Sequence, residues 1–178
     1  MNPVEASASS AEKILLAATD LFAANHFNGV SIKEIAKKSG VNSALISYYF
    51  GGKKNLYQEV LNEQSNLFLN LIARVSSKDI APLAKLREYI TAISEVQKLH
   101  PHRIHLIYRE LLTPTFMCDS FIKNRLYKIH KFMSELVTEA IADGSIRNNM
   151  QPTHVAFTLE SIIVFFFLTC RATYAYHI

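Results

Sequence analysis

Residues 30–61 read VSIKEIAKKSGVNSALISYYFGGKKNLYQEVL, and this stretch decides the fold of the N-terminal part of the chain. Ser31 is followed three residues later by Glu34, which is the pattern of a capping box at the start of a helix. The pattern predicts a helix from Ile32 to Lys38. Gly40 then breaks the helical spacing, because glycine readily adopts the left-handed conformation found at helix ends.

A second short helix is expected directly after this turn. Asn42 or Ser43 caps it, and it runs to about Phe50, before the break at Gly51-Gly52. The positions expected to face inward, at helical spacing, are Ile46, Tyr49 and Phe50. Two short helices joined by a glycine-containing turn predict a helix-turn-helix over about residues 32–50.

The basic residues are concentrated in the same region. Between Ser31 and Asn55 stand five lysines and one acid, so the local excess of five minus one is +4, equal to the +4 of the whole chain. A basic patch of this kind favours binding to phosphates. A solvated lysine-rich helix face is the alternative that charge alone leaves open. The lysines are Lys33, Lys37, Lys38, Lys53 and Lys54.

The second helix of such a motif enters the major groove of DNA, with its N-terminal residues against base edges. The candidates for base contacts are Ser43, Ala44, Ser47 and Tyr48. The candidates for phosphate contacts are Ser31, Lys33, Tyr48, Tyr49 and Lys53. Ser31 and Lys53 each stand at a helix start, where free backbone N–H groups favour an anion. Tyr49 has the alternative of a place in the core.

Helical spacing extends over the rest of the chain and predicts an all-α fold. Ser9 or Ser10 caps the first helix, and further helices are expected over 53–75, 82–99, 101–112, 116–143 and 152–175. We expect residues 1–52 to form the helix-turn-helix DNA-binding domain. Residues 53–178 are expected to form a larger helical domain for ligand binding and dimerisation.

The last helix is apolar nearly all round, which indicates burial on more than one face. We therefore expect a homodimer in which the last two helices of each copy form a four-helix bundle; a core helix in a monomer is the alternative. The expected interface residues are Leu159, Ile162, Ile163, Phe166 and Phe167. A pocket is expected among the middle helices, although such residues are also typical of a core. Its candidates are Tyr89, Ile93, Leu106, Tyr108, Arg109, Phe121, Tyr127 and Phe132.

The sequence offers little for other classes of function. We find no Ser/His/Asp set, phosphate-binding loop or HExxH motif, so we expect neither an enzyme nor a cofactor. A metal sensor using His100, His102 and His105, or a redox pair of Cys118 and Cys170, are the alternatives. With no signal peptide or apolar stretch of about 20 residues, a soluble cytoplasmic protein without membrane contact is expected.

The stretch quoted above, with the helix that precedes it, resembles the DNA-binding region of TetR-family repressors. The resemblance covers about Ala11 to Leu61, and ALISYYFGGK resembles a subgroup with a Gly-Gly-Lys turn. The matching residues are Phe22, Gly29, Ser31, Ile35, Ala36, Gly40, Val41, Tyr48, Phe50, Lys53 and Leu56.

The resemblance implies a homodimer on a palindromic operator in double-stranded DNA, released by a small-molecule inducer. Family DNA contacts fall on Ser31, Lys33, Ser43, Ala44, Ser47, Tyr48, Tyr49 and Lys53. Ser47 departs from the many relatives that have tyrosine there, which puts a direct base contact at this position in doubt. The alternative is a helix-turn-helix regulator controlled by metal, thiol oxidation or a protein partner.

Overall fold

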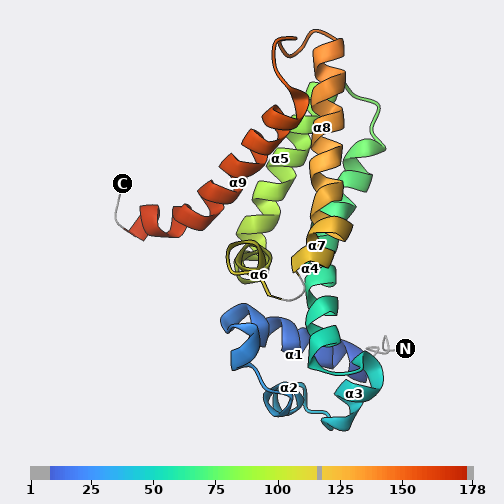
Figure 1. Cartoon of the computed structure of the whole chain (residues 1–178), viewed down its shortest axis with the longest axis vertical. Helices are drawn as coiled ribbons and strands as arrows, with labels where there is room; N and C mark the ends of the chain where they lie inside the picture. The colour runs from blue at the N-terminus through green and yellow to red at the C-terminus, as the bar shows by residue number, and fades with distance from the viewer. Residues whose placement is uncertain (1–8, 116–117, 176–178) are drawn as a thin grey trace, which may run out of the picture. The chain divides into compact units, whose positions relative to one another are not determined.

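A computed structural model describes residues 9–115 and 118–175. Within these residues the regular structure is entirely helical, which confirms the predicted all-α architecture (Figure 1). The chain divides into two compact units, one within Met1–Glu63 and the other within Gln64–Ile178. The long helix α4, Lys53–Ser76, contributes to both units. The expected domain boundary after residue 52 coincides with the start of α4, whereas the compact units divide inside this helix.

The first unit is built on helix α1, Ser10–Ala24, which packs against both α2, Ile32–Ser39, and α3, Ala44–Phe50. A 3₁₀ turn, Phe27–Gly29, joins α1 to α2. Burial of apolar side chains at helical spacing stabilises this arrangement. The core residues are Ile14, Ala18, Phe22, Ile35, Ala36, Ile46, Leu56, Tyr57, Val60 and Leu61.

Helix α1 begins at a capping box, where the sequence predicted a cap at Ser9 or Ser10. The backbone N–H of Ser9 donates to Oε2 of Glu12 at 2.7 Å, and the backbone N–H of Glu12 donates to Oγ of Ser9 at 3.2 Å. Two N–H groups that the helix cannot pair internally are thereby satisfied. Ser9, rather than Ser10, is therefore the cap.

The second unit contains the helices α5, Pro82–Leu99, α6, Pro101–Leu112, α8, Tyr127–Ala142, and α9, Pro152–Ala175, together with the later turns of α4. Helices α5 and α8 run side by side, and α9 packs against both (Figure 1). Proline stands in the first turn of α5 and α6, where its missing N–H costs no hydrogen bond.

The long helix expected over residues 116–143 is present over residues 118–142, but a π-helical segment interrupts its α-helical hydrogen bonding. The structure has a short helix α7, Cys118–Phe121, then a π-helical segment η2, Ile122–Leu126, and then α8. Residues 116 and 117 lie outside the described residues. The π turn contains neither proline nor glycine. Within it, Nη1 of Arg125 donates to Oδ1 of Asn66 on α4 at 2.8 Å.

Candidate DNA-binding surface and ligand cavity

The start of α2 is held by the predicted capping box. The N–H of Ser31 donates to Oε2 of Glu34 at 2.7 Å, and the N–H of Glu34 donates to Oγ of Ser31 at 3.2 Å. Hydrogen bonding to the side chain and then the backbone of Ser31 lowers the pKa of Glu34 below its usual value. Ser31 and Lys33 are both exposed in this first turn, where the helix dipole favours an anion.

The turn between α2 and α3 has the conformation that glycine was expected to permit. Gly40 has φ 69°, in the left-handed region, and the N–H of Val41 donates to the carbonyl of Ala36 at 3.2 Å. The N–H of Ala44 donates to Oδ1 of Asn42 at 2.9 Å. Asn42 therefore supplies the side-chain acceptor at the start of α3.

Helix α3 buries one side and exposes the other. Ile46 is fully buried, whereas Ser43, Ala44, Ser47 and Tyr48 are exposed. The N-terminal residues proposed to read base edges therefore all face solvent.

The two tyrosines of α3 lie together at its exposed side. Tyr48 is 79% exposed and Tyr49 is 47% exposed, and their ring centroids are 5.0 Å apart in an edge-to-face arrangement. The expected inward position of Tyr49 is therefore wrong, because the side chain packs along the surface against Tyr48 and Phe50. Both hydroxyl groups are available to an external partner.

Lys53 is the first residue of α4. Among the residues predicted to contact DNA, it is the one that is half-buried. Its ammonium lies 4.2 Å from the centroid of the Phe27 ring, which in turn packs against the rings of Phe22 and Tyr57. Burial lowers the pKa of Lys53, and the nearby charge of Glu34 opposes that change. The starts of α2 and α4 therefore lie close enough to interact electrostatically.

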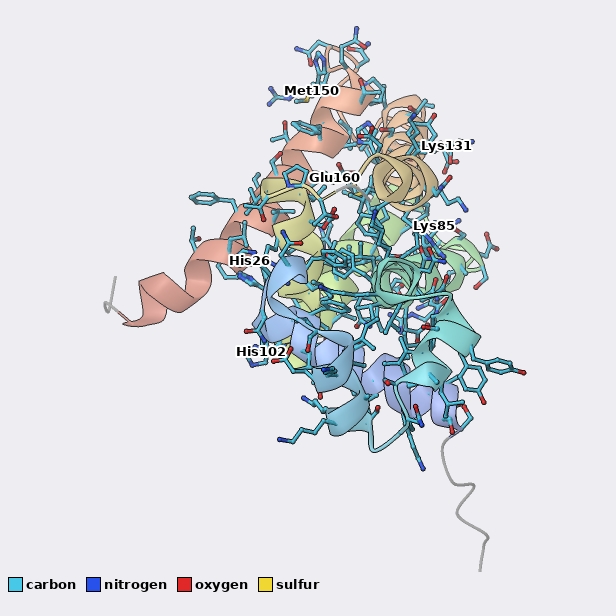
Figure 2. The ribbon with its side chains drawn as sticks, turned by 60° about the horizontal axis from the view of Figure 1, so that its bottom comes forward. His26, Lys85, His102, Lys131, Met150 and Glu160 are labelled. Atoms are coloured by element: carbon cyan, nitrogen blue, oxygen red, sulfur yellow. The ribbon has the colours of Figure 1, made fainter. Side chains whose placement is uncertain are left out.

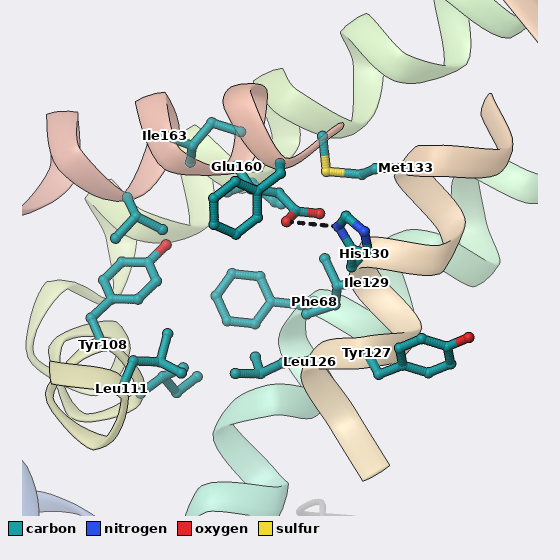
Figure 3. Close-up of a pocket in the computed structure, with 14 residues that line it drawn as sticks. Phe68, Tyr108, Leu111, Leu126, Tyr127, Ile129, His130, Met133, Glu160 and Ile163 are labelled. Carbon is teal, nitrogen blue, oxygen red and sulfur yellow. Dashed lines mark hydrogen bonds and ion pairs between the residues drawn. The ribbon is translucent and has the colours of Figure 1, made fainter. Parts of the chain in front are cut away.

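The second unit contains a cavity of about 500 Å³ between α4, α5, α6, α8 and α9 (Figure 3). This volume lies within the usual range for sites that hold small organic molecules. Most of its wall is aliphatic or aromatic. The lining residues are Phe68, Ile93, Ile107, Tyr108, Leu111, Leu126, Tyr127, Ile129, His130, Met133, Phe157, Glu160, Ile163 and Val164.

A hydrogen bond across the cavity wall joins α9 to α8. Nδ1 of His130 lies 3.2 Å from Oε2 of Glu160, and Nε2 of the same ring lies 3.5 Å from Oγ of Ser134 (Figure 3). Burial raises the pKa of Glu160, and the interaction with His130 opposes that rise. Because the carboxylate can only accept, the Nδ1–H group of His130 is the donor in this pair.

Tyr108 supplies a second polar group at the edge of the cavity. Nε2 of Gln97 donates to its hydroxyl oxygen at 2.5 Å in the buried interior. Burial raises the pKa of Tyr108 to about 12, so the phenol stays protonated at neutral pH.

Comparison with known proteins identifies the family to which the chain belongs. Residues 14–60 match the family model described as bacterial regulatory proteins, tetR family. The HTH-type transcriptional regulator RutR of Escherichia coli K12 is 30% identical over 146 residues, which cover 82% of this chain and 68% of RutR. The chain belongs to the TetR family.

Solved structures of related regulators support the same assignment for this TetR-family protein. HlyIIR, a hemolysin II transcriptional regulator, is 31% identical with a TM-score of 0.69, over 88% of this chain and 86% of that one. AibR in complex with isovaleryl coenzyme A and operator DNA is 25% identical with a TM-score of 0.76, over 89% and 86% of the two chains. The TetR-family chain is therefore a DNA-binding transcriptional regulator, and its relatives are regulators rather than enzymes.

The structure distributes the predicted pocket residues of this TetR-family regulator between cavity and core. Ile93, Tyr108 and Tyr127 line the cavity. Arg109 lies on α6 outside the lining, half exposed. The remaining four are buried in the core, where Tyr89 packs edge-to-face on Phe132 with centroids 5.0 Å apart. These four are Tyr89, Leu106, Phe121 and Phe132.

Sequence reasoning identified Tyr108 but missed the two ionisable groups of the cavity. Neither Glu160 nor His130 belongs to a recognisable motif, and the two stand 30 positions apart. The sequence signal that could have identified Glu160 is a carboxylate on the inward side of an apolar helix. Its spacing from Ile163 and Val164, which also line the cavity, places it on that side.

Helix α9 exposes much of its apolar surface in the single chain. Ile162, Phe165 and Phe166 are 60%, 69% and 60% exposed. Leu159 is half exposed near the same face, whereas Ile163 lines the cavity. Phe167 turns into its own unit, with its ring 5.4 Å from that of Tyr108.

The window Pro152–Thr169 of α9 is long and apolar enough to cross a membrane by length and composition, with a mean hydropathy of 1.5 and 6% of its residues buried. The sequence expectation considered only a shorter apolar stretch. An exposed apolar window of this kind is typical of a surface that contacts protein or lipid.

The metal and thiol alternatives gain no support from the described geometry. Among the residues that the structure describes, no three His, Cys, Asp or Glu side chains come together as a metal site. His105 lies beside the Phe167 ring, at 6.4 Å between centroids. The side chains of Cys118 and Cys170 lie outside the described part of the chain.

Proposed function

We propose that this TetR-family regulator is a homodimeric repressor that binds a palindromic operator and is released when an organic inducer occupies the cavity of the second unit. The observation that carries this proposal is the exposed face of α3. Ser43 at its N-cap, and Ala44, Ser47 and Tyr48 within it, face solvent around a fully buried Ile46. A helix held in this way can enter a major groove without any rearrangement of its core.

The first unit supplies both kinds of DNA contact. Ser43, Ala44, Ser47 and Tyr48 meet the base edges, where serine hydroxyls donate or accept and Ala44 contacts a thymine methyl group. Phosphates are bound at the starts of α2 and α4, where N–H groups and cations coincide. The residues that bind phosphate are Ser31, Lys33, Tyr48, Tyr49 and Lys53.

A second copy of the chain covers the exposed face of α9. Leu159, Ile162 and Phe166 form the centre of this two-fold interface, while Ile163 and Phe167 support it from inside the unit. Glu160 argues against lipid as the cover, because an ionisable side chain halfway along the window is costly in hydrocarbon. A two-fold dimer presents two α3 helices and therefore requires two half-sites in inverted orientation.

Inducer binding is assigned to the second unit. The volume and apolar wall of the cavity suit a small organic molecule. AibR, a related regulator, has been solved with both an organic ligand and operator DNA. We therefore divide the chain into a DNA-binding domain over residues 1–52 and a ligand-binding and dimerisation domain over residues 53–178.

Selection from a random library of DNA duplexes tests the proposal without knowledge of the operator. The wild-type protein should enrich an inverted repeat, and its affinity should fall steeply with added salt. Tyr48→Ala and Lys53→Ala should bind the selected duplex weakly. Lys131→Ala is the matched control, because this exposed lysine lies on α8 (Figure 2). Undiminished binding by both first-unit variants would contradict the proposal.

A further inference from the structure

One oxygen of Glu160 is left without a hydrogen bond although it is buried. Oε2 of this carboxylate pairs with His130, but no described group donates to Oε1, which has almost no contact with solvent. Buried acceptors of this kind cost free energy when they stay unpaired, and the cost is larger for a charged group. The vacant acceptor belongs to a residue that lines the cavity.

The rest of the cavity wall favours positive charge. The rings of Phe68, Tyr108, Tyr127 and Phe157 contribute to the lining, and aromatic faces attract cations. Among the described lining residues there is neither lysine nor arginine. Lys131 of the same unit is exposed on α8, whereas Glu160 is half-buried and lines the cavity (Figure 2).

From this geometry we infer that the cavity binds an apolar organic amine, whose protonated nitrogen donates to Oε1 of Glu160 while its hydrocarbon part fills the aromatic and aliphatic space. The inference rests on the proposed ligand-binding role of this cavity and specifies the chemistry of the ligand. Oε2 is already bonded to His130 and Oε1 is covered in the free protein, so the carboxyl group rotates toward the cavity when the ammonium binds.

The same arrangement disfavours anions. A carboxylate or a coenzyme A thioester would bring negative charge into an apolar space whose one acidic side chain is Glu160, and the described lining holds no permanent cation to offset it. The cavity therefore differs in charge preference from a site for the acyl coenzyme A seen with AibR.

Calorimetric titration of the full chain, free of DNA, with three matched probes tests the inference. Phenylbutylamine, phenylbutanol and phenylbutanoate share one hydrocarbon frame and differ in the head group. We expect the amine to bind about tenfold more tightly than the alcohol, since hydrogen bonds to charged groups exceed neutral ones by ~1.4 kcal/mol. The carboxylate and isovaleryl coenzyme A should bind most weakly.

Two variants test whether Glu160 is the source of the preference for the amine. Glu160→Gln should abolish the advantage of the amine and leave the affinity for the alcohol within about twofold. Glu135→Gln, which removes an exposed carboxylate from α8, should change neither. Equal affinities, absence of amine binding, tighter binding of the carboxylate or the thioester, or an unchanged preference in Glu160→Gln overturns the inference.

A separate measurement distinguishes this inference from the proposed function. If the amine binds through Glu160 but the selected DNA duplex stays bound, the ligand chemistry holds and the inducer role fails. If the duplex selection and the first-unit variants behave as proposed while no probe discriminates by charge, DNA binding holds and the amine inference fails.

Discussion

The ammonium of Lys53 lies 4.2 Å from the centre of the Phe27 ring, so the lysine expected to bind a DNA phosphate is positioned by an aromatic side chain of its own unit. The ring packs against Phe22 and Tyr57, which are both buried in the core. One face of the ammonium is thus occupied, and its remaining hydrogen-bond donors stay available. Binding of a phosphate then requires less ordering of the lysine than a freely rotating side chain would.

Phe27→Leu should weaken DNA binding by about two- to fivefold, which corresponds to the ~0.5–1 kcal/mol typical of an exposed cation–π contact. The physical reason is that leucine cannot hold the ammonium of Lys53 in place as the Phe27 ring does. A double-mutant cycle in fluorescence anisotropy checks it, because Phe27→Leu should have no further effect once Lys53→Ala is present.

The Lys53→Ala variant should also reduce the slope of log affinity against log salt by about 1, as expected for one lost phosphate contact. Thermal melting of each variant controls for unfolding, since Phe27 also packs in the core. Tighter DNA binding by Phe27→Leu would show instead that the ring competes with the phosphate.

Replacement of Ser31 by aspartate should preserve folding but weaken DNA binding. Aspartate is as good an N-cap as serine, whereas alanine costs about 1 kcal/mol of stability. Ser31→Asp should therefore melt close to the wild type, yet bind DNA far more weakly, because its charge faces a phosphate. Anisotropy and thermal melting separate the two effects.

Ser9 offers a matched control for this experiment, because its capping box with Glu12 has the same hydrogen-bond distances of 2.7 and 3.2 Å as that of Ser31. Ser9→Asp should leave both stability and DNA affinity nearly unchanged. Equal DNA affinity for Ser31→Asp and Ser9→Asp would show that Ser31 serves only as a cap.

The helix-turn-helix could be predicted from the sequence because its signals are local. The capping box of Ser31 and Glu34 and the left-handed Gly40 each depend on a few neighbouring residues, and the structure has both. The orientation of Tyr49 could not be predicted in the same way. Helical spacing gives the two sides of a short helix, but the tertiary packing of Ile46 against the unit decides which side is buried.

The full lining of the cavity could not be predicted, because it depends on which face of each helix meets another helix. Tyr89 and Tyr127 have similar sequence surroundings, yet one is buried in the core and the other lines the cavity. The π-helical segment before Tyr127 has no breaker residue to announce it. The pairing of His130 with Glu160 joins residues 30 positions apart, beyond the reach of local patterns.

Ile162→Asp should convert the proposed dimer into a monomer, because it places a charge at the centre of an apolar interface. Light scattering after size exclusion measures the mass directly. Leu99→Asp is the control, since Leu99 is 73% exposed at the end of α5 and should not affect assembly. A dimer of unchanged stability in Ile162→Asp would contradict the assignment of this face.

The monomeric variant should also bind the full inverted repeat more weakly than the wild type. At high protein concentration, it should bind a single half-site as well as the wild type does. The physical reason is effective concentration, because the second half-site is bound intramolecularly only by a dimer. Equal affinity of both proteins for the full repeat would show that DNA binding does not depend on this interface.

Glu160→Gln should raise the melting temperature at pH 8 and have a progressively smaller effect as the pH falls towards 4.5. Burial raises the pKa of Glu160 above 4.5, and the opposing interaction with His130 is weaker than this effect. A carboxyl whose folded pKa is raised stabilises the fold fully below its unfolded pKa, and that stabilisation is lost as pH rises through the folded value. Glutamine does not titrate, so the difference between the two proteins should grow with pH. Melting curves of both proteins over this range check the sign. A lower melting temperature for Glu160→Gln at pH 8 would show that the hydrogen bond with His130 outweighs the cost of burying the charge.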